Sequence, residues 1–151
     1  MIEIRRTDAS DEDFFKLVEL LDTELAERDG TEHAYYAQFN KIENIRHVVI
    51  ACVGGRSVSC GAIKHFGLKT MEIKRMFTIP DHRGKGIAAM VLDELEKWAL
   101  ELSCTRCVLE TGKKQPEAIR LYTKCGYSLI PNYGQYAEME NSVCFAKEIV
   151  I

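Results

Sequence analysis

The chain opens with a short alternation of apolar and charged residues and then changes to helical spacing. Residues 2–7 alternate along the backbone, which predicts a strand with one solvent-facing side. Over residues 14–25 the apolar side chains recur every three or four positions, which predicts an amphipathic helix. Ser10 is the expected N-terminal cap of that helix, and Asp29-Gly30 its expected end. A shorter and less regular helix is expected around residues 33–39.

The following segment has the pattern of a strand meander. Strands are predicted over residues 46–53, 57–65 and 71–79, because each is rich in apolar and β-branched residues. Gly54-Gly55 matches a two-residue hairpin turn, and residues 67–70 make the next turn. Three antiparallel neighbouring strands are therefore expected.

Beyond residue 79 the pattern alternates between helices and strands. Helices are expected over residues 86–102 and 116–124, and strands over residues 106–110, 127–130 and 143–149. The predicted order is β-α-α-β-β-β-α-β-α-β-β in a single domain over residues 1–151. This order is typical of an α/β protein with a mixed sheet and helices on both faces.

Charge and composition narrow the classes of function. The formal net charge of −3 gives no broad basic face, which argues against a nucleic-acid partner and restricts any anion site to a local feature. The first ten residues carry charges where a signal peptide would be apolar, and the longest apolar run, residues 48–53, is too short to span a bilayer. We expect a cytoplasmic protein with no membrane association.

Six cysteines are expected to be free, mostly buried thiols, as in a reducing compartment. Cys104 and Cys107 have the spacing of a metal or redox pair, but no second pair accompanies them and the four histidines lack ligand spacing. We therefore expect no metal. A role for this pair stays open.

A cluster of glycine and basic residues lies between a predicted strand and a predicted helix. Arg83, Gly84, Lys85 and Gly86 precede the first helical turn, whose N–H groups have no intrahelical acceptor. Glycine lets a phosphate approach the backbone closely, so this segment predicts an anion site. The alternative is a tight turn with solvated charges.

A dinucleotide site is one form that such an anion site can take. Gly84-x-Gly86-x-x-Ala89 matches a dinucleotide fingerprint, and Glu110 ends the next strand, where an acidic ribose ligand is expected. Against it, residues 80–83 separate the strand from the first glycine, and only one βαβ unit follows a meander. A nucleotide-binding oxidoreductase module remains the alternative from another class.

Longer motifs around this cluster carry a family resemblance. RGKGIA, residues 83–88, resembles the [QR]xxGx[GA] signature of the GCN5-related N-acetyltransferase (GNAT) superfamily. Residues 71–99 resemble that family's strand, diphosphate loop and helix, and VLETGKKQPEAIRLYTKCGY at residues 108–127 resembles its next strand and helix. The resemblance covers residues 71–130 well and the rest by element order. It implies a centrally splayed sheet.

The resemblance implies acetyl-coenzyme A as acyl donor. Its diphosphate would lie on the backbone amides of Arg83, Gly84, Lys85, Gly86, Ile87 and Ala88. Its pantetheine arm would pair with the strand edge at Met76, Phe77 and Thr78. Gln115 stands where the family often has asparagine, so its contact with the pantetheine arm keeps an amide on a longer side chain.

The resemblance also implies catalytic roles for direct transfer of an acetyl group to a primary amine. Tyr122 would protonate the leaving thiolate, and Glu72 would be the base; Glu110 or a water molecule is the alternative base. A core tyrosine and a solvent-facing or Lys74-paired glutamate are the alternative interpretations of the first two. A non-catalytic coenzyme A sensor with the same fold is the main rival function.

The acceptor is the least defined part of the prediction. The segments that wall the acceptor pocket in the family contain acidic and aromatic residues here: Asp29, Glu32, His33, Tyr35, Tyr36, Asn132, Tyr133, Tyr136, Glu138 and Glu140. Such groups suit a cationic small-molecule amine, while a solvated acidic loop is the plain alternative. A peptide or protein amine stays open, as does a homodimer, because family members often pair through sheet edges.

Overall fold

The computed structural model describes residues 1–30 and 45–149. These residues form a seven-stranded sheet in the order β1-β2-β3-β4-β5-β7-β6. The strands are β1 (Ile2–Thr7), β2 (His47–Val53), β3 (Arg56–Gly67), β4 (Thr70–Thr78), β5 (Arg106–Gly112), β6 (Ser128–Ile130) and β7 (Ser142–Glu148). All neighbours are antiparallel except β4 and β5, so the predicted mixed sheet is confirmed.

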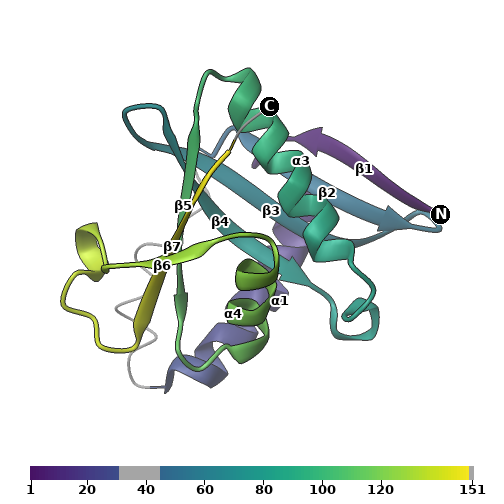
Figure 1. The fold of residues 1–151 in the computed structure, drawn as a ribbon. Helices are drawn as coiled ribbons and strands as arrows, with labels where there is room; N and C mark the ends of the chain where they lie inside the picture. Colours follow the sequence, from purple (N-terminus) through teal and green to yellow (C-terminus); the bar gives the residue numbers. More distant parts are fainter. Residues whose placement is uncertain (31–44, 150–151) are drawn as a thin grey trace.

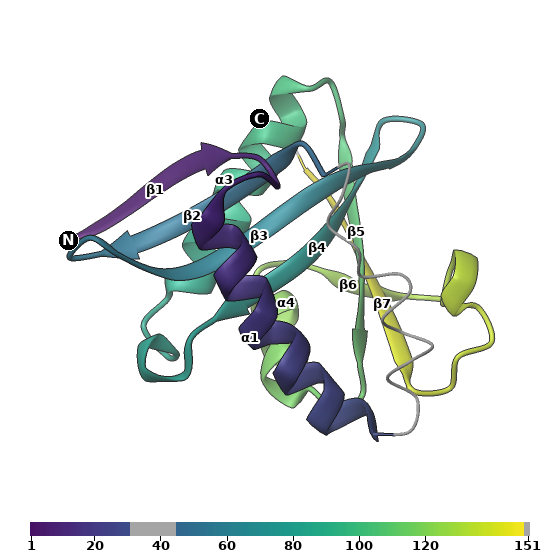
Figure 2. The same ribbon diagram turned by 180° about the vertical axis from the view of Figure 1, so that it is seen from behind.

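Helices cover both faces of this sheet. α1 (Glu12–Asp29) lies on one face and α3 (Ile87–Glu101) on the other, as the two opposite views in Figures 1 and 2 show. α4 (Pro116–Lys124) lies beside the end of β5, on the same side as α3. Short 3₁₀ turns span Pro80–His82 and Gly134–Tyr136. The helix expected around residues 33–39 lies outside the described residues.

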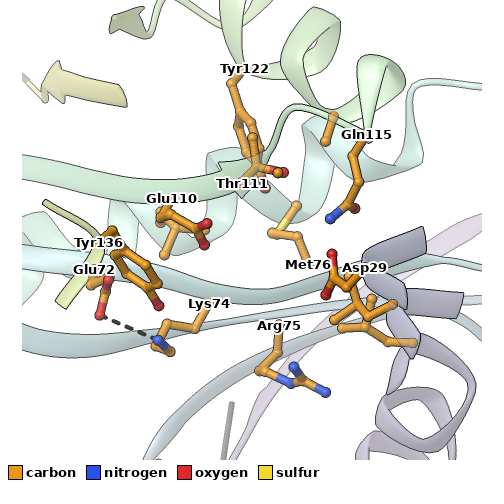
Figure 3. A pocket seen from close by; sticks show the side chains of 15 residues that line it. Asp29, Glu72, Lys74, Arg75, Met76, Glu110, Thr111, Gln115, Tyr122 and Tyr136 are labelled. Atoms are coloured by element: carbon orange, nitrogen blue, oxygen red, sulfur yellow. Dashed lines mark ion pairs between the residues drawn. The ribbon is translucent and has the colours of Figure 1, made fainter. Parts of the chain in front are cut away.

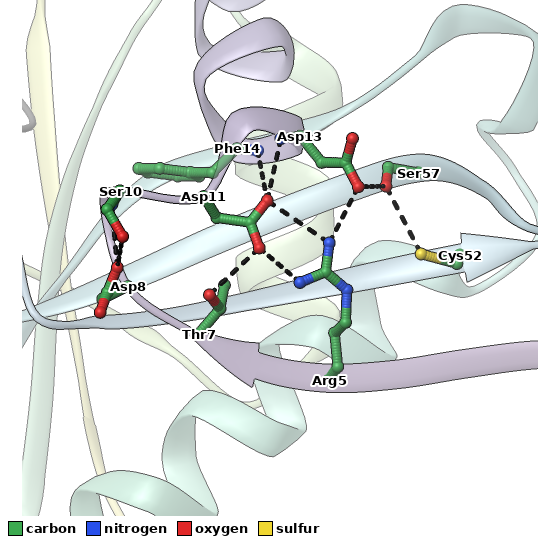
Figure 4. A network of polar contacts seen from close by, with 9 residues as sticks. All are labelled: Arg5, Thr7, Asp8, Ser10, Asp11, Asp13, Phe14, Cys52 and Ser57. Carbon is green, nitrogen blue, oxygen red and sulfur yellow. Dashed lines mark hydrogen bonds and ion pairs between the residues drawn. The ribbon is translucent and has the colours of Figure 1, made fainter.

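The N-terminus of α1 is capped one residue later than expected. Asp11, not Ser10, accepts hydrogen bonds from the N–H groups of the first turn, at 2.8 and 3.3 Å. The Ser10 hydroxyl donates to Asp8 instead. Arg5 and Thr7 both donate to the Asp11 carboxylate, which holds the cap against β1 (Figure 4). Ser10 and Asp11 are both good N-cap residues, so the sequence alone does not choose between them. The contacts with Arg5 and Thr7 select Asp11.

The core is built by one stripe from each helix. α1 buries Phe14, Leu17, Val18 and Leu21 against β3 and β4. α3 buries Ile87, Val91, Leu92, Leu95 and Ala99. The helix was expected to run to Leu102, but it ends at Glu101, and the Leu102 side chain is 39% exposed. The predicted helix is therefore confirmed to within one residue at each end.

β4 and β5 separate soon after they meet. Their parallel pairing covers Thr70 with Arg106, Met71 with Cys107 and Glu72 with Val108. Beyond Glu72 the strands diverge, so the edge of β4 that faces β5 has no strand neighbour there (Figure 1). Arg75 has a positive φ of 57°, and the β3–β4 register shifts opposite it, which marks a β-bulge next to the gap. The predicted central splay is confirmed.

Gly61 on β3 lies under the bulge and leaves room for Met76. A Cβ atom at Gly61 would clash with Met76 Sδ and lie 2.9 Å from Leu95 Cδ1. We expect Gly61→Ala to lower the free energy of unfolding by about 1–3 kcal/mol, because Leu95 is fully buried and cannot move freely. Urea denaturation measures this change.

Gly67→Ala is the matched control for the Gly61 substitution. No atom lies within 4 Å of a Cβ atom built at Gly67, and its φ is ordinary. We expect a change within about 0.5 kcal/mol there. Equal stability of the two variants would contradict the close packing under the bulge.

A buried polar cluster ties α3 to the last strand. Glu96 accepts from the Tyr127 hydroxyl at 2.9 Å and from Lys147 Nζ at 2.8 Å. Glu96 and Tyr127 are 8% and 4% exposed. Because Tyr127 directly follows the α4 turn, this cluster fixes the end of α4 against α3 and β7.

All six cysteines are free, and four of them are buried: Cys60, Cys104, Cys107 and Cys144. Burial raises the pKa of the Cys60 and Cys107 thiols to about 12. Within residues 1–30 and 45–149, His, Cys, Asp and Glu form no group that could hold a metal ion. None of the helices in these ranges is long and apolar enough to cross a membrane.

Candidate active site

The turn between β4 and α3 presents an open backbone at a helix N-terminus. Gly84 and Gly86 have φ values of 78° and 80°, and no atom lies within 4 Å of a Cβ atom built at either residue. Gly86 precedes α3 directly, and Met90 N donates to Gly86 O at 3.2 Å. The N–H groups before Met90 are therefore those that a helix leaves without an intrahelical acceptor.

A cavity of about 460 Å³ opens at this turn. We call it the loop cavity. Its lining comes from the turn, the end of β4, α1 and α4, and includes Met76, Phe77, Thr78, Arg83, Gly84, Gly86, Ile87, Ala88, Gln115, Leu121 and Tyr122. These residues include ten of those expected to bind the cofactor or to catalyse. Lys85 is exposed and does not belong to the lining.

Arg83 is held against the wall of the loop cavity. Its Nε donates to Thr78 O at 2.7 Å, and Nη2 lies 3.0 Å from Glu24 Oε1 on α1. Its guanidinium also lies over the Phe77 ring, 5.4 Å from the ring centroid. This side chain thus crosslinks the turn to α1.

A smaller cavity of about 100 Å³ lies between the diverging parts of β4 and β5. We call it the splay cavity. Its polar lining consists of Asp29, Glu72, Lys74, Arg75, Glu110, Thr111, Gln115, Tyr122 and Tyr136 (Figure 3). Met76, Gln115 and Tyr122 line both cavities, so the two meet at the splay.

Glu110 reaches the splay cavity from β5. Its Oε2 accepts from the Ser142 hydroxyl at 2.7 Å. Burial is the main cause that raises the pKa of its carboxyl to about 7; the charges of Asp29 and Glu72 act in the same direction, and the Ser142 hydrogen bond and the Lys74 charge act against it. A carboxyl group with this pKa exchanges its proton near neutral pH.

Glu72 reaches the same cavity from β4, but both of its oxygens have partners. The Tyr133 hydroxyl donates to Oε2 at 2.6 Å, and Lys74 Nζ lies 3.5 Å from Oε1. The residue is 7% exposed. The structure therefore brings Glu72 and Glu110 to one cavity and gives them different surroundings.

Tyr122 extends from α4 towards the junction of the two cavities (Figure 3). It is 6% exposed, and its ring packs edge-on against Tyr127 with the ring centroids 5.8 Å apart. Burial raises the pKa of its hydroxyl above the usual value, so the group is protonated at neutral pH. At neutral pH the hydroxyl can therefore act as a proton donor and not as a proton acceptor.

The acceptor residues expected from the sequence are only partly placed at the splay cavity. Asp29 and Tyr136 line the splay cavity. Tyr133 does not line it but donates a hydrogen bond to Glu72, which does. Asn132 instead donates to Met139 O and Ser142 O and so closes the last loop. The lining does not include Glu138 or Glu140. Glu32, His33, Tyr35 and Tyr36 lie outside the described residues.

Some contacts at the site had no sequence signal. Ser142 on β7 and Tyr133 in the last loop bond to the two glutamates from positions distant in the sequence. Thr111 lines the splay cavity from the end of β5, and Arg75 lines it from the bulge in β4. Only the sheet order, with β7 between β5 and β6, brings these residues together.

Similarity to a known family model shows to which family the chain belongs. A family model described as the acetyltransferase (GNAT) family matches residues 14–127. The chain belongs to this family. The matched residues include most of α1, the turn between β4 and α3, and α4, which all contribute to the lining of the loop cavity. The resemblance seen in the sequence is therefore confirmed.

Relatives with curated names agree with membership of the GNAT family. An uncharacterized N-acetyltransferase, YsnE, from Bacillus subtilis is 33% identical over 98 residues, 64% of this chain and 65% of that protein. The chain thus matches just under two thirds of that protein's length. An IAA acetyltransferase from Azospirillum brasilense is 32% identical over 128 residues, 80% of each chain.

Solved structures of GNAT proteins share the fold over nearly the whole chain. A presumed acyl-CoA N-acyltransferase from Klebsiella pneumoniae superposes with a TM-score of 0.83 at 26% identity, over 99% of both chains. PaiA N-acetyltransferase from Thermoplasma acidophilum, solved in complex with coenzyme A, superposes with a TM-score of 0.70 at 17% identity. It covers 98% of this chain and 99% of that one.

Proposed function

We propose that this protein transfers the acetyl group of acetyl-coenzyme A to a primary amine by direct attack. The observation that carries the proposal is the meeting of two cavities at Tyr122. One cavity ends at an open helix N-terminus, which suits a diphosphate, and the other contains carboxylates, which suit an amine. The reacting atoms of both substrates would then meet at the splay.

The lining of the loop cavity supplies the groups that coenzyme A would need. The unpaired N–H groups of the α3 N-terminus would hold the diphosphate, and the free edge of β4 from Ile73 to Thr78 would pair with the amides of the pantetheine arm. Gln115 lines both cavities and supplies an amide at the passage between them. The thioester would then lie next to Tyr122.

The chemistry requires one proton acceptor and one proton donor. We propose Glu110 as the base that takes the proton of the amine, in preference to Glu72, because both oxygens of Glu72 are already engaged. The amine nitrogen then bonds to the thioester carbon, and the carbon–sulfur bond breaks. Tyr122 gives its proton to the departing thiolate, which leaves as coenzyme A thiol.

The rival functions differ in what the fold allows. A dinucleotide crevice needs parallel strands on both sides of a switch point. Among the strands in residues 1–30 and 45–149, only β4 and β5 are parallel neighbours, and a 3₁₀ turn separates β4 from the glycines. A coenzyme A sensor without turnover has the same fold and the same loop cavity. The carboxylates at the splay favour the enzyme over the sensor, since a sensor has no use for a proton acceptor there.

Gly86→Asp tests the placement of the diphosphate. The substitution puts a carboxylate in the open space at the α3 N-terminus, so we expect the Kd for acetyl-coenzyme A to rise by about 100-fold or more. Isothermal titration calorimetry measures this affinity. The unsubstituted protein should bind coenzyme A and show no heat with NAD.

Gly86→Ala is the matched control for the charge. It imposes the same strain at the positive φ of Gly86 without adding a carboxylate. We expect its Kd to stay within about 10-fold of the original value. Normal affinity in Gly86→Asp would show that the diphosphate binds elsewhere, and binding of NAD alone would refute the proposed cofactor.

A further inference from the structure

One side chain of the splay cavity has a buried donor without an acceptor. Among the buried side-chain nitrogen and oxygen atoms of the residues that the structure describes, Arg75 Nε, Arg106 Nε and Asn141 Nδ2 have no hydrogen-bond partner. Arg106 Nε still lies 3.2 Å from Glu148 Oε2, and neither Arg106 nor Asn141 lines a cavity. Arg75 lines the splay cavity. Because a buried donor without an acceptor costs free energy, a ligand oxygen beside Arg75 Nε would be stabilised.

The Arg75 guanidinium is buried, whereas its ion-pair partner is not. Arg75 Nη2 donates to Asp22 on α1, and the two side chains are 2% and 50% exposed. Water screens a half-exposed carboxylate, so this pair offsets only part of the cost of burying the guanidinium charge. An anion in the splay cavity would add a buried opposite charge and would also supply the acceptor that Nε lacks.

The β-bulge in β4 brings two cations to this cavity. Arg75 has a φ of 57°, which residues other than glycine rarely adopt, and a bulge of this kind re-aims a side chain. Lys74 and Arg75 follow one another in β4, and both line the splay cavity (Figure 3). Lys74 Nζ lies 3.5 Å from Glu72 Oε1, which is long for a hydrogen bond. Strained backbone is found mainly at functional sites, so the bulge favours a binding role for this pair of cations.

The two sides of the splay cavity differ in charge. Figure 3 shows Glu110 on one side and Lys74 and Arg75 on the other. Glu72 and Asp29, which also line the cavity, already have interaction partners of their own. A molecule with one positive and one negative group, each facing its opposite, therefore suits this cavity better than a simple amine does.

The remainder of the lining favours a small occupant with an aliphatic side chain. Leu21, Leu25 and Ile73 contribute an apolar wall. The volume of about 100 Å³ has room for several water molecules, and thus for a molecule of few heavy atoms. Size, charge and apolar wall together describe a small zwitterion.

We infer that the preferred acceptor is a small aliphatic amino acid, whose amine lies beside Glu110 and whose carboxylate accepts a hydrogen bond from Arg75 Nε. Arg75 is then the residue that determines specificity for amino acids over simple amines, and Lys74 adds positive charge on the same side. The inference rests on the proposed acetyl transfer and names the substrate class of that site. The amine gives one proton to Glu110 and replaces the coenzyme A sulfur on the acetyl carbon, so the product is an N-acetyl amino acid.

A matched series of acceptors tests the class directly. L-Alanine, L-valine and L-leucine are compared with the amines that lack the carboxylate and with the neutral carboxamides, by kcat/KM corrected to the concentration of unprotonated amine. We expect the best amino acid to exceed its amine by about 10-fold to 100-fold, which is the range for one charge-assisted hydrogen bond, and its carboxamide to lie between them. Amines or carboxamides as good as the amino acids would overturn the inference.

Arg75→Lys tests the residue, because lysine has a methylene group where arginine has Nε and keeps a positive charge at its end. We expect the ratio of amino acid to amine kcat/KM to fall to about one, mainly through a higher KM for the amino acid. Arg56→Lys is the matched control, since Arg56 pairs with Asp81 at the surface and lines neither cavity. An unchanged ratio in Arg75→Lys, including an equal loss for both acceptors, would refute the role of Arg75.

Two binding measurements separate a failure of this inference from a failure of the proposed function. Calorimetry first establishes whether the protein binds acetyl-coenzyme A, and then whether its coenzyme A complex binds L-leucine more tightly than 3-methylbutylamine. This comparison uses the unsubstituted protein, so it decides the inference even where Arg75→Lys does not fold. Cofactor binding with acetylation of simple amines, but no preference for amino acids, would refute the inference alone. Lack of cofactor binding, together with no acetylation of any amine, would refute both.

Discussion

Tyr122→Phe is expected to lower kcat by about 100-fold and to leave the Kd for acetyl-coenzyme A within about 3-fold. The substitution removes one hydroxyl from the junction of the two cavities and keeps the ring that packs on Tyr127. Without this donor the thiolate must leave unprotonated, which raises the barrier of the chemical step alone. Release of coenzyme A thiol, followed with a thiol reagent, gives kcat, and calorimetry gives Kd.

Tyr127→Phe is the control for loss of a buried hydroxyl. Tyr127 lies at the end of the same helix and bonds to Glu96, and it lines neither cavity. We expect it to lower the free energy of unfolding by about 1–3 kcal/mol and to keep most of kcat. An unchanged kcat in Tyr122→Phe would remove Tyr122 from the chemistry and favour its interpretation as a core tyrosine.

Glu110→Gln is expected to lower kcat/KM by about 100-fold at pH 8. In the unsubstituted protein the carboxyl pKa of about 7 means that the base form accumulates as the pH rises through 7. Activity should therefore rise through an inflection near pH 7, and the variant should lack this inflection. A pH profile of kcat/KM with one amine measures both effects.

The stability of Glu110→Gln provides an independent check, because the substitution is expected to lower activity but to raise the free energy of unfolding at pH 8. The folded pKa of Glu110 is raised above the ordinary value of 4.5, so the unfolded chain loses the proton first as the pH rises. Between about pH 4.5 and pH 7 ionisation therefore lowers the stability of the folded protein. We expect the variant to be more stable than the original at pH 8, by roughly 1–3 kcal/mol, and to show less difference at pH 4.

Glu72→Gln discriminates between the two possible bases. It is expected to retain the inflection near pH 7, because that inflection belongs to Glu110. If instead Glu72→Gln loses the inflection and Glu110→Gln keeps it, the original assignment of Glu72 as the base is correct. If both variants keep it, a water molecule takes the proton.

Much of the fold could be predicted because its signals are local. The hairpin at Gly54-Gly55 and the ends of α4 follow from turn and cap residues that act within a few positions. The RGKGIA motif at residues 83–88 likewise predicted an open helix mouth, and the positive φ values of Gly84 and Gly86 agree with it. Such features need no knowledge of tertiary contacts.

The remainder of the site depends on contacts between distant residues. The sequence placed Arg83 at the expected anion site but gave no sign of its contact with Glu24, 59 positions earlier. Glu72 and Glu110 have similar local surroundings in the sequence, and only their partners Tyr133 and Ser142 distinguish them. Helical or strand periodicity cannot predict such pairs, because it describes one element at a time.

The short pairing of β4 with β5 also bears on the stability of the protein. Three register pairs connect a half made of β1 to β4 with a half made of β5 to β7. A pantetheine arm seated along β4 would supply hydrogen bonds that the polypeptide itself omits, so cofactor would act as a missing strand. Cohesion of the two halves would then depend on the total concentration of coenzyme A, acetylated or free, and depletion of that pool would lower the stability of the protein.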